Sequence, residues 1–185
     1  IFNNSISALV GLRDRLRPEA FERAVGELAK ARRIEIFGTG SSTVAAEDAQ
    51  HKLGRLGLAA VARTETQLQS LSATFLSADD VLLVLSDSGA PDPLNDAVAR
   101  ARKAGAKVLA MCPQRSELAR LADVLLPVDH PEDLAAMVPM VTRLMQTVII
   151  DVLVTDLALQ RRDLISRSLA LQDDQRFGVL SSHLR

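Results

Sequence analysis

The feature that most constrains this chain is a repeated alternation of short apolar runs with longer segments of helical period. The apolar runs have the length of strands and lie at 33–37, 59–62, 81–85, 107–111 and 124–128. Segments with helical spacing of apolar residues separate them, at 43–56, 67–76, 94–104 and 116–122. Short apolar strands that alternate with helices predict a parallel sheet covered by helices on both faces.

This pattern predicts an α/β fold, a three-layer αβα sandwich of the flavodoxin type. Its five-stranded parallel sheet is expected to have the doubly wound order 2-1-3-4-5. Further helices are expected at 5–16, at 17–30 and, as one long helix, at 135–161. We divide the chain into N-terminal linker helices at 1–31, the sheet domain at 32–162 and a C-terminal tail at 163–185.

Composition excludes several classes of protein. The chain is 48% hydrophobic with five Phe and no Trp or Tyr, so the core must consist of Leu, Val, Ala and Ile. A net charge of −1 argues against this segment binding nucleic acid alone. A single Cys112 excludes an intrachain disulfide, and no signal peptide is visible, so we expect a cytoplasmic protein. The apolar stretch 137–159 is interrupted by Arg143, Asp151 and Asp156, which predicts a buried helix and not a membrane span.

Two serine-rich loops follow the first and third predicted strands, at 38–42 and 86–89. In the order 2-1-3-4-5 these two strands are neighbours, so both loops should meet at one crevice at the carboxyl end of the sheet. Backbone N–H groups at a helix start, together with serine hydroxyls, are donors suited to an anion. The pattern predicts a phosphorylated small molecule bound by Gly38, Gly40, Ser41, Ser42, Ser86, Ser88 and Gly89.

Asp87 lies inside the second of these loops and would repel a phosphate. A carboxylate about 5 Å from the anion would cost roughly 3 kcal/mol at an effective dielectric constant of about 20. Alternate residues of an extended chain point to opposite sides, which puts Ser86 and Ser88 together and Asp87 opposite them. We therefore expect Asp87 to face away from the ligand and to cap neighbouring backbone.

A dinucleotide site is the main rival interpretation of the first loop. Gly38 and Gly40 begin the glycine-rich fingerprint, but Thr43 stands where its third glycine belongs. Glu65 comes late for the acid that binds ribose, and this interpretation leaves the second serine loop unexplained. A nucleotide P-loop is excluded because no Gly-Lys-Ser/Thr follows. No cofactor is expected, and no cluster of side chains has metal-ligand spacing.

Together with segments 47–52, 131–133, 139–143 and 150–153, the two loops resemble a sugar isomerase (SIS) domain. More narrowly, the chain resembles the effector domain of RpiR-type bacterial transcription regulators of the HexR kind, over about residues 30–160. The resemblance implies a sensor of 2-keto-3-deoxy-6-phosphogluconate or another sugar phosphate, with phosphate contacts from Ser41, Ser42, Ser86, Ser88 and Gly89. It also implies a helix-turn-helix domain upstream, through which alone the protein would bind DNA.

Two other functions stay open. A stand-alone sugar-phosphate isomerase of the same fold would need an acid–base group, for which His51, His130 and Glu132 are the candidates. We expect 129–133 to be a polar turn, with His130 and Glu132 as candidate sugar contacts and with no catalytic residue. The family's second loop usually continues Gly-x-Thr, where this chain has Pro91. A degenerate domain kept for dimerisation is therefore the third possibility.

The pattern of the long predicted helix indicates that the chain forms an oligomer. Its first half carries a polar stripe of Arg143, Gln146 and Thr147. Seven residues later the same face of the helix is apolar, so its second half has almost no polar side to turn towards solvent. We expect a homodimer or a higher homo-oligomer; the alternative is that the N-terminal helix or the tail covers this surface. Two reactive side chains are expected outside the site, Cys112 as a small core residue and Lys52 in solvent or at an interface.

Overall fold

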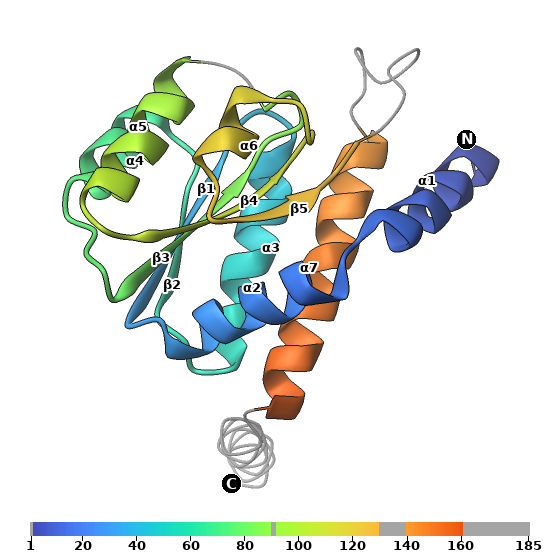
Figure 1. The fold of residues 1–185 in the computed structure, drawn as a ribbon, viewed down its shortest axis with the longest axis horizontal. Helices are drawn as coiled ribbons and strands as arrows, with labels where there is room; N and C mark the ends of the chain where they lie inside the picture. Colours follow the sequence, from blue (N-terminus) through green and yellow to red (C-terminus); the bar gives the residue numbers. More distant parts are fainter. Residues whose placement is uncertain (1, 90–91, 130–139, 161–185) are drawn as a thin grey trace, which may run out of the picture.

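The computed structural model describes residues 2–89, 92–129 and 140–160 of the 185-residue chain (Figure 1). Its helices and strands alternate as the apolar periods predict. In chain order they are α1 (Phe2–Arg15), α2 (Pro18–Lys30), β1 (Arg33–Gly38), α3 (Ser42–Arg55), β2 (Ala60–Arg63), α4 (Thr66–Ala73), β3 (Asp80–Leu85), α5 (Asp92–Lys103), β4 (Lys107–Cys112), α6 (Glu117–Leu121), β5 (Val124–Pro127) and α7 (Met140–Gln160).

The five strands form one parallel sheet in the order β2-β1-β3-β4-β5, which confirms the predicted topology. β1 pairs with β3 from Arg33 opposite Asp80 to Gly38 opposite Leu85. The carboxyl ends of these two strands are therefore level, and the loops that follow them start side by side.

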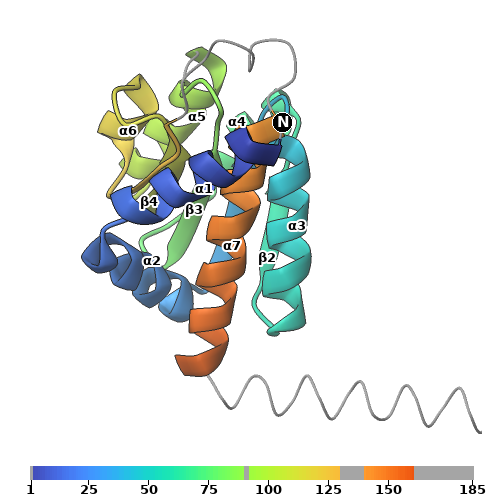
Figure 2. The same ribbon diagram turned by 90° about the vertical axis from the view of Figure 1, so that its right-hand side faces the viewer.

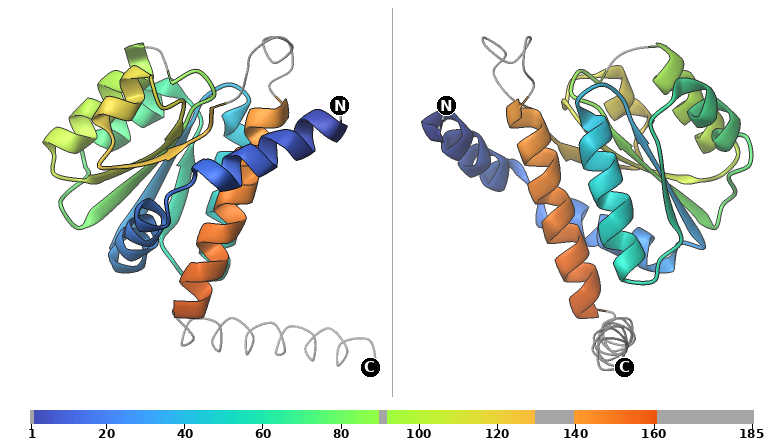
Figure 3. Two further views of the ribbon diagram at one scale, coloured as in Figure 1. Left: turned by 45° about the vertical axis from the view of Figure 1, so that its right-hand side comes forward. Right: turned by 180° about the vertical axis from the view of Figure 1, so that it is seen from behind.

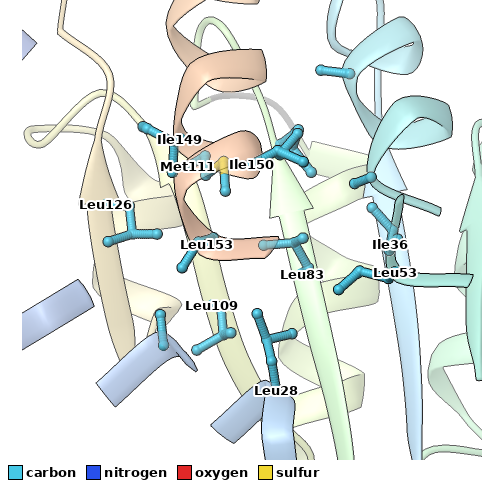
Figure 4. Packing of buried hydrophobic residues seen from close by; sticks show 14 of the residues in the cluster. Leu28, Ile36, Leu53, Leu83, Leu109, Met111, Leu126, Ile149, Ile150 and Leu153 are labelled. Atoms are coloured by element: carbon cyan, nitrogen blue, oxygen red, sulfur yellow. The ribbon is translucent and has the colours of Figure 1, made fainter. Parts of the chain in front are cut away.

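Helices cover both faces of the sheet, as expected for a three-layer sandwich (Figure 1). One face packs against α1, α2, α3 and α7, and the other packs against α4, α5 and α6. The strands supply alternate residues to the two cores, so Leu83 belongs to the first and Leu82 and Val84 to the second. Figure 4 shows the first core, where Ile149, Ile150 and Leu153 of α7 face the strands. Both cores are mainly aliphatic, as the composition predicts.

α7 lies against the sheet between α2 and α3 (Figure 2). The N-terminal helices contribute Leu12, Val25 and Leu28 to the same core, and α1 crosses α7 (Figure 3). They cover part of α7 within one chain, which is the alternative left open above. In the single chain Asp151 and Val152 of the second half of α7 are exposed, so the N-terminal helices do not cover all of the surface that we expect a partner to cover. None of the helices in the described ranges is long and apolar enough to span a membrane.

Two buried carboxylates of the sheet are paired with arginines. Asp80, at the amino end of β3, accepts hydrogen bonds from Arg32 at 2.8 Å and from the Ser77 hydroxyl at 2.9 Å. Glu35 in β1 accepts one from Arg63 of β2 at 3.1 Å. These pairings compensate charge that burial would otherwise make costly, so both carboxylates have a structural role.

Candidate functional site

The two serine-rich loops meet at the carboxyl end of the sheet. We call residues 38–42 the first loop and residues 86–89 the second loop. The Ser41 hydroxyl donates a hydrogen bond to Asp87 Oδ2 over 3.2 Å, across 46 residues of sequence. This contact confirms the prediction that the order of the strands brings both loops to one place.

The first loop has the backbone geometry that lets α3 start directly after β1. Gly40 has a φ of +56°, a conformation that glycine adopts without strain. Gly38 is buried, and a Cβ added there would lie 2.8 Å from Ala46 Cβ and 2.9 Å from the Ser42 carbonyl oxygen. The glycines therefore let the first turn of α3 approach the end of β1 closely, with its N-terminus directed to the loops.

Ser42 begins α3 and is fully buried. Its hydroxyl accepts a hydrogen bond from Gln146 Nε2 of α7 at 3.0 Å. Gln146 is itself fully buried, and its Oε1 has no hydrogen-bond partner in the described part of the chain. Among the residues of the predicted polar stripe, Arg143 is exposed, whereas Gln146 points inward and joins α7 to the first loop.

A second glutamine, Gln69 of α4, holds the first loop from the opposite face of the sheet. Its Nε2 donates to the carbonyl of Gly38 at 3.0 Å and to that of Arg63 at 2.8 Å. Neither glutamine is among the site residues that the sequence predicts. Each glutamine stands among other polar residues of its helix, and this pattern does not reveal which of them is buried or what it binds.

The second loop is closed by its own bonds. Ser86 is fully buried, and its hydroxyl accepts a hydrogen bond from the Gly89 N–H at 3.0 Å. Gly89 has a φ of +64°, and a Cβ added there would lie 2.2 Å from Ser116 Cβ. Leu118 N–H donates to the Gly89 carbonyl at 3.2 Å, so the loop is fixed against the start of α6.

The side chain of Asp87, a residue of the second loop, lies between the two loops. Its Oδ1 accepts a hydrogen bond from the Ser88 N–H at 2.9 Å, which is the expected contact with neighbouring backbone. Its Oδ2, however, accepts from Ser41 of the first loop, so the expectation that Asp87 faces away from the predicted site is wrong. The alternation rule requires an extended chain, and the second loop has already left the strand and turned.

The predicted site residues differ in exposure. Ser88 and Gly40 are exposed and Ser41 is half-buried, whereas Ser42 and Ser86 are fully buried. The candidate sugar contacts His130 and Glu132 lie outside the described residues. So do Ala90 and Pro91, where the second loop departs from the Gly-x-Thr pattern. His51, the third acid–base candidate, is exposed on α3.

Lys52 takes part in a separate cluster. Its Nζ forms ion pairs with Asp48 of α3, at 2.7 Å, and with Asp151 of α7. Burial alone would lower the pKa of Lys52, but the hydrogen bonds to Asp151 and Asp48 outweigh it and raise the pKa above its ordinary value. Lys52 therefore bridges α3 and α7 within one chain.

Cys112 is a fully buried core residue at the end of β4, as expected. Burial raises the pKa of its thiol, a hydrogen bond with Ser116 opposes this, and the charge of Asp129 adds a smaller rise, so that the pKa is about 11. A thiol with this pKa is a poor nucleophile at neutral pH. Among the residues described here, no three His, Cys, Asp or Glu side chains are grouped so as to hold a metal ion.

Comparison with known proteins shows close relatives among bacterial regulators. The chain is 37% identical to the HTH-type transcriptional regulator HexR of Pseudomonas aeruginosa over 161 residues, 87% of this chain and 56% of HexR. It is also 37% identical to the bifunctional protein glk of Paraburkholderia xenovorans, again over 87% of this chain but over 25% of that protein. The chain thus spans between a quarter and just over half of these relatives.

Solved structures share the fold. The sugar isomerase domain of an RpiR transcription factor from Sphaerobacter thermophilus has a TM-score of 0.84 at 23% identity, covering 94% of this chain and 96% of that one. The Vibrio vulnificus NanR protein, complexed with ManNAc-6P, has a TM-score of 0.86 at 21% identity, covering 96% and 68%. Residues 27–156, more than half of the chain, match the SIS domain family. With this match and with its sheet order, the chain belongs to the SIS domain family.

Proposed function

We propose that this chain is the sugar-phosphate-sensing effector domain of a bacterial transcription regulator of the RpiR and HexR kind, acting on carbohydrate catabolism without catalysing a reaction. The observation that carries the proposal is the contact of the two loops through Ser41 and Asp87 at 3.2 Å. Donors from two distant segments are thereby gathered at the N-terminus of a helix, where an anion is stabilised.

The ligand would be held mainly by neutral donors. Ser41 and Ser88, which are the accessible serines of the loops, would donate to the phosphate together with backbone N–H groups. Ser42 and Ser86 are buried and fix the loops through the bonds they accept from Gln146 and Gly89, so they would shape the loops around the anion, and their O–H groups stay available as donors. The full proposed set is Gly38, Gly40, Ser41, Ser42, Ser86, Ser88 and Gly89, with His130 and Glu132 as proposed sugar contacts.

The relatives support a regulator. HexR carries the name of a helix-turn-helix transcriptional regulator, and this chain matches 56% of it. In our proposal residues 1–31 link the domain to a DNA-binding region elsewhere in the longer protein, and 163–185 form a tail. The protein would act in the cytoplasm, and 2-keto-3-deoxy-6-phosphogluconate is the effector that the resemblance to HexR-like regulators favours.

A homodimer is part of the proposal. α1 exposes Phe2, Ile6 and Val10, which are spaced by four residues and lie on one side of the helix, with exposed fractions of 86%, 59% and 44%. An exposed stripe of large apolar side chains indicates a surface that another protein covers. Light scattering at micromolar concentration should give twice the mass of the chain, and a monomer would refute the dimer.

Calorimetric titration tests the ligand. The domain should bind one or more members of a panel of hexose and pentose phosphates, including 2-keto-3-deoxy-6-phosphogluconate, and should not bind the unphosphorylated sugars. Ser41→Ala should weaken binding about tenfold or more, because one hydrogen bond to a charged group is worth about 1.5–3 kcal/mol. Ser7→Ala, at an exposed serine of α1, is the matched control and should change nothing.

The same panel distinguishes the remaining possibilities. Interconversion of aldose and ketose phosphates, followed by NMR, would favour the isomerase and refute a pure sensor. Absence of heat with every phosphate would favour a domain retained for dimerisation alone.

A further inference from the structure

We propose that Asp87 is a built-in competitor of the phosphate: its carboxylate is bound to hydrogen-bond donors that the anion would use. The inference rests on the proposed function, since it concerns the same two loops. It assigns a role to Asp87, whose carboxylate accepts hydrogen bonds from both loops.

Each oxygen of the Asp87 carboxylate is bound to a donor of the proposed site. Oδ2 accepts from the Ser41 hydroxyl of the first loop at 3.2 Å, and Oδ1 accepts from the Ser88 N–H of the second loop at 2.9 Å. A bound phosphate would bridge the loops in the same way. The carboxylate therefore acts as an internal anion that satisfies donors of both loops.

The surrounding bonds keep Asp87 close to the site when a ligand arrives. Gly89 N–H is bound to Ser86, and Gly89 packs against Ser116 with no room for a Cβ, so the backbone of the second loop is fixed on both sides of Asp87. On losing its donors, the carboxylate can rotate, but it stays within reach of the incoming charge. Binding then costs the exchange of hydrogen bonds and the repulsion of two anions.

This competition would give the site a preference among anions. A phosphate brings up to two charges and several acceptor oxygens, so it can replace the carboxylate at both donors with stronger hydrogen bonds. A ligand carboxylate would only exchange one equivalent group for another. Asp87 would thus discriminate against sugar acids that lack a phosphate and would raise the phosphate concentration at which the sensor responds, as a repulsive element does in other specific sites.

Titration of inorganic phosphate and glucose 6-phosphate into the chain and its variants tests the proposal. Asp87→Asn and Asp87→Ala should each bind both phosphates at least tenfold more tightly than the parent chain. Their ligand-free melting temperatures should fall, most for Asp87→Ala, which leaves Ser41 and the Ser88 N–H without this acceptor. Asp156→Asn removes the same charge from the second half of α7, keeps an acceptor for Gln160, and should leave the affinity unchanged.

A positioning role for Asp87 gives a different result. If the carboxylate orients Ser41 for the ligand, Asp87→Ala will bind phosphate more weakly than the parent chain and Asp87→Asn about as well. That result, or equal affinities of all three chains, would refute the proposal that Asp87 competes with the phosphate. The proposed function survives that outcome as long as Ser41→Ala still weakens binding. If neither the parent chain nor any Asp87 variant binds phosphate or glucose 6-phosphate, the competitor is overturned, and failure of the whole sugar-phosphate panel would then remove the proposed function.

Discussion

The first and second loops are both rich in serine and glycine but are held in different ways. The first loop is tied to distant elements, because Ser42 is bound by Gln146 of α7 and the Gly38 carbonyl is bound by Gln69 of α4. The second loop closes on itself through Ser86 and Gly89 and rests on the start of α6.

The difference suggests a division of roles between the loops. A shift at the first loop would reach α7 directly, through a buried amide whose Oε1 has no partner in the described residues. The second loop is fixed by the bonds that Gly89 makes to Ser86 and Leu118 and by its contact with Ser116. A signal from bound ligand to α1, whose exposed apolar stripe we propose for assembly, would therefore pass through the first loop and α7.

The largest effect on stability is expected from Gly89→Ala, which disrupts the fixed backbone of the second loop. A residue with a Cβ is strained at a φ of +64°, and the new atom would overlap Ser116 Cβ at 2.2 Å. We expect a loss of about 3 kcal/mol or more in the free energy of unfolding, measured with urea. Ser116 is also the N-cap of α6, where its hydroxyl accepts from the Ala119 N–H. Ser116→Gly in the same chain should therefore recover the part of the loss caused by overlap, while replacing the cap by glycine costs a few tenths of a kcal/mol. An unchanged stability of Gly89→Ala would show that the second loop is not fixed.

Gly38→Ala should perturb the first loop with a smaller loss. The added Cβ would meet Ala46 Cβ at 2.8 Å and the Ser42 carbonyl at 2.9 Å, which pushes the first turn of α3 outward. Overpacking of this kind costs about 1–3 kcal/mol, and ligand affinity should fall with it. Gly26→Ala in α2 is the matched control, since its Cβ meets nothing within 4 Å. That control should be neutral or stabilising by up to about 1 kcal/mol.

Gln146→Leu should cut the bond between α7 and the first loop at modest cost. Ser42 loses a donor, but the buried Oε1 that lacks a partner is also removed, so we expect a change of about 1 kcal/mol or less. Combined with Ser42→Ala the loss should be smaller than the sum of the two single losses, because both variants remove the same bond. Additive losses in urea unfolding would mean that the bond contributes nothing.

The smallest effect is expected at Cys112, beneath the second loop. Native protein at pH 8 should react with a thiol reagent only as fast as it unfolds, because the thiol is buried and its pKa is about 11. Since the folded pKa lies above the unfolded value of 9.0, this thiol supports stability below pH 9 and that support is lost as the pH rises towards 11. Cys112→Ala should reduce the loss of stability over that range, and rapid labelling of native protein would contradict the burial.

The fold could be predicted from the sequence because its signals are local and repeated. Every strand is a short apolar run, and α3 and α5 end at Arg55 and Lys103, just before the glycines at 57 and 105. Neighbouring strands then follow from general rules of parallel sheets, which is why the meeting of the two loops was predictable as well.

The partners within the site were not predictable in the same way. The bond to Ser42 comes from Gln146, 104 residues later, and depends on how α7 rotates when it packs between α2 and α3. Asp87 was placed by the alternation of an extended chain, but a turn that ends at Gly89 redirects it towards Ser41. Local pattern therefore locates the loops, whereas tertiary packing decides which of their donors are already in use.

The long sequence separations within the site have a consequence for the lifetime of the protein. Ser41 meets Asp87 across 46 residues and Ser42 meets Gln146 across 104, so the binding geometry exists only once almost the whole domain has folded. A ligand that binds there recognises only the finished fold, and at a hundred times its Kd it would add about 2.7 kcal/mol to stability. It would slow unfolding and leave folding unaided, so cellular proteases would remove the empty sensor sooner than the occupied one.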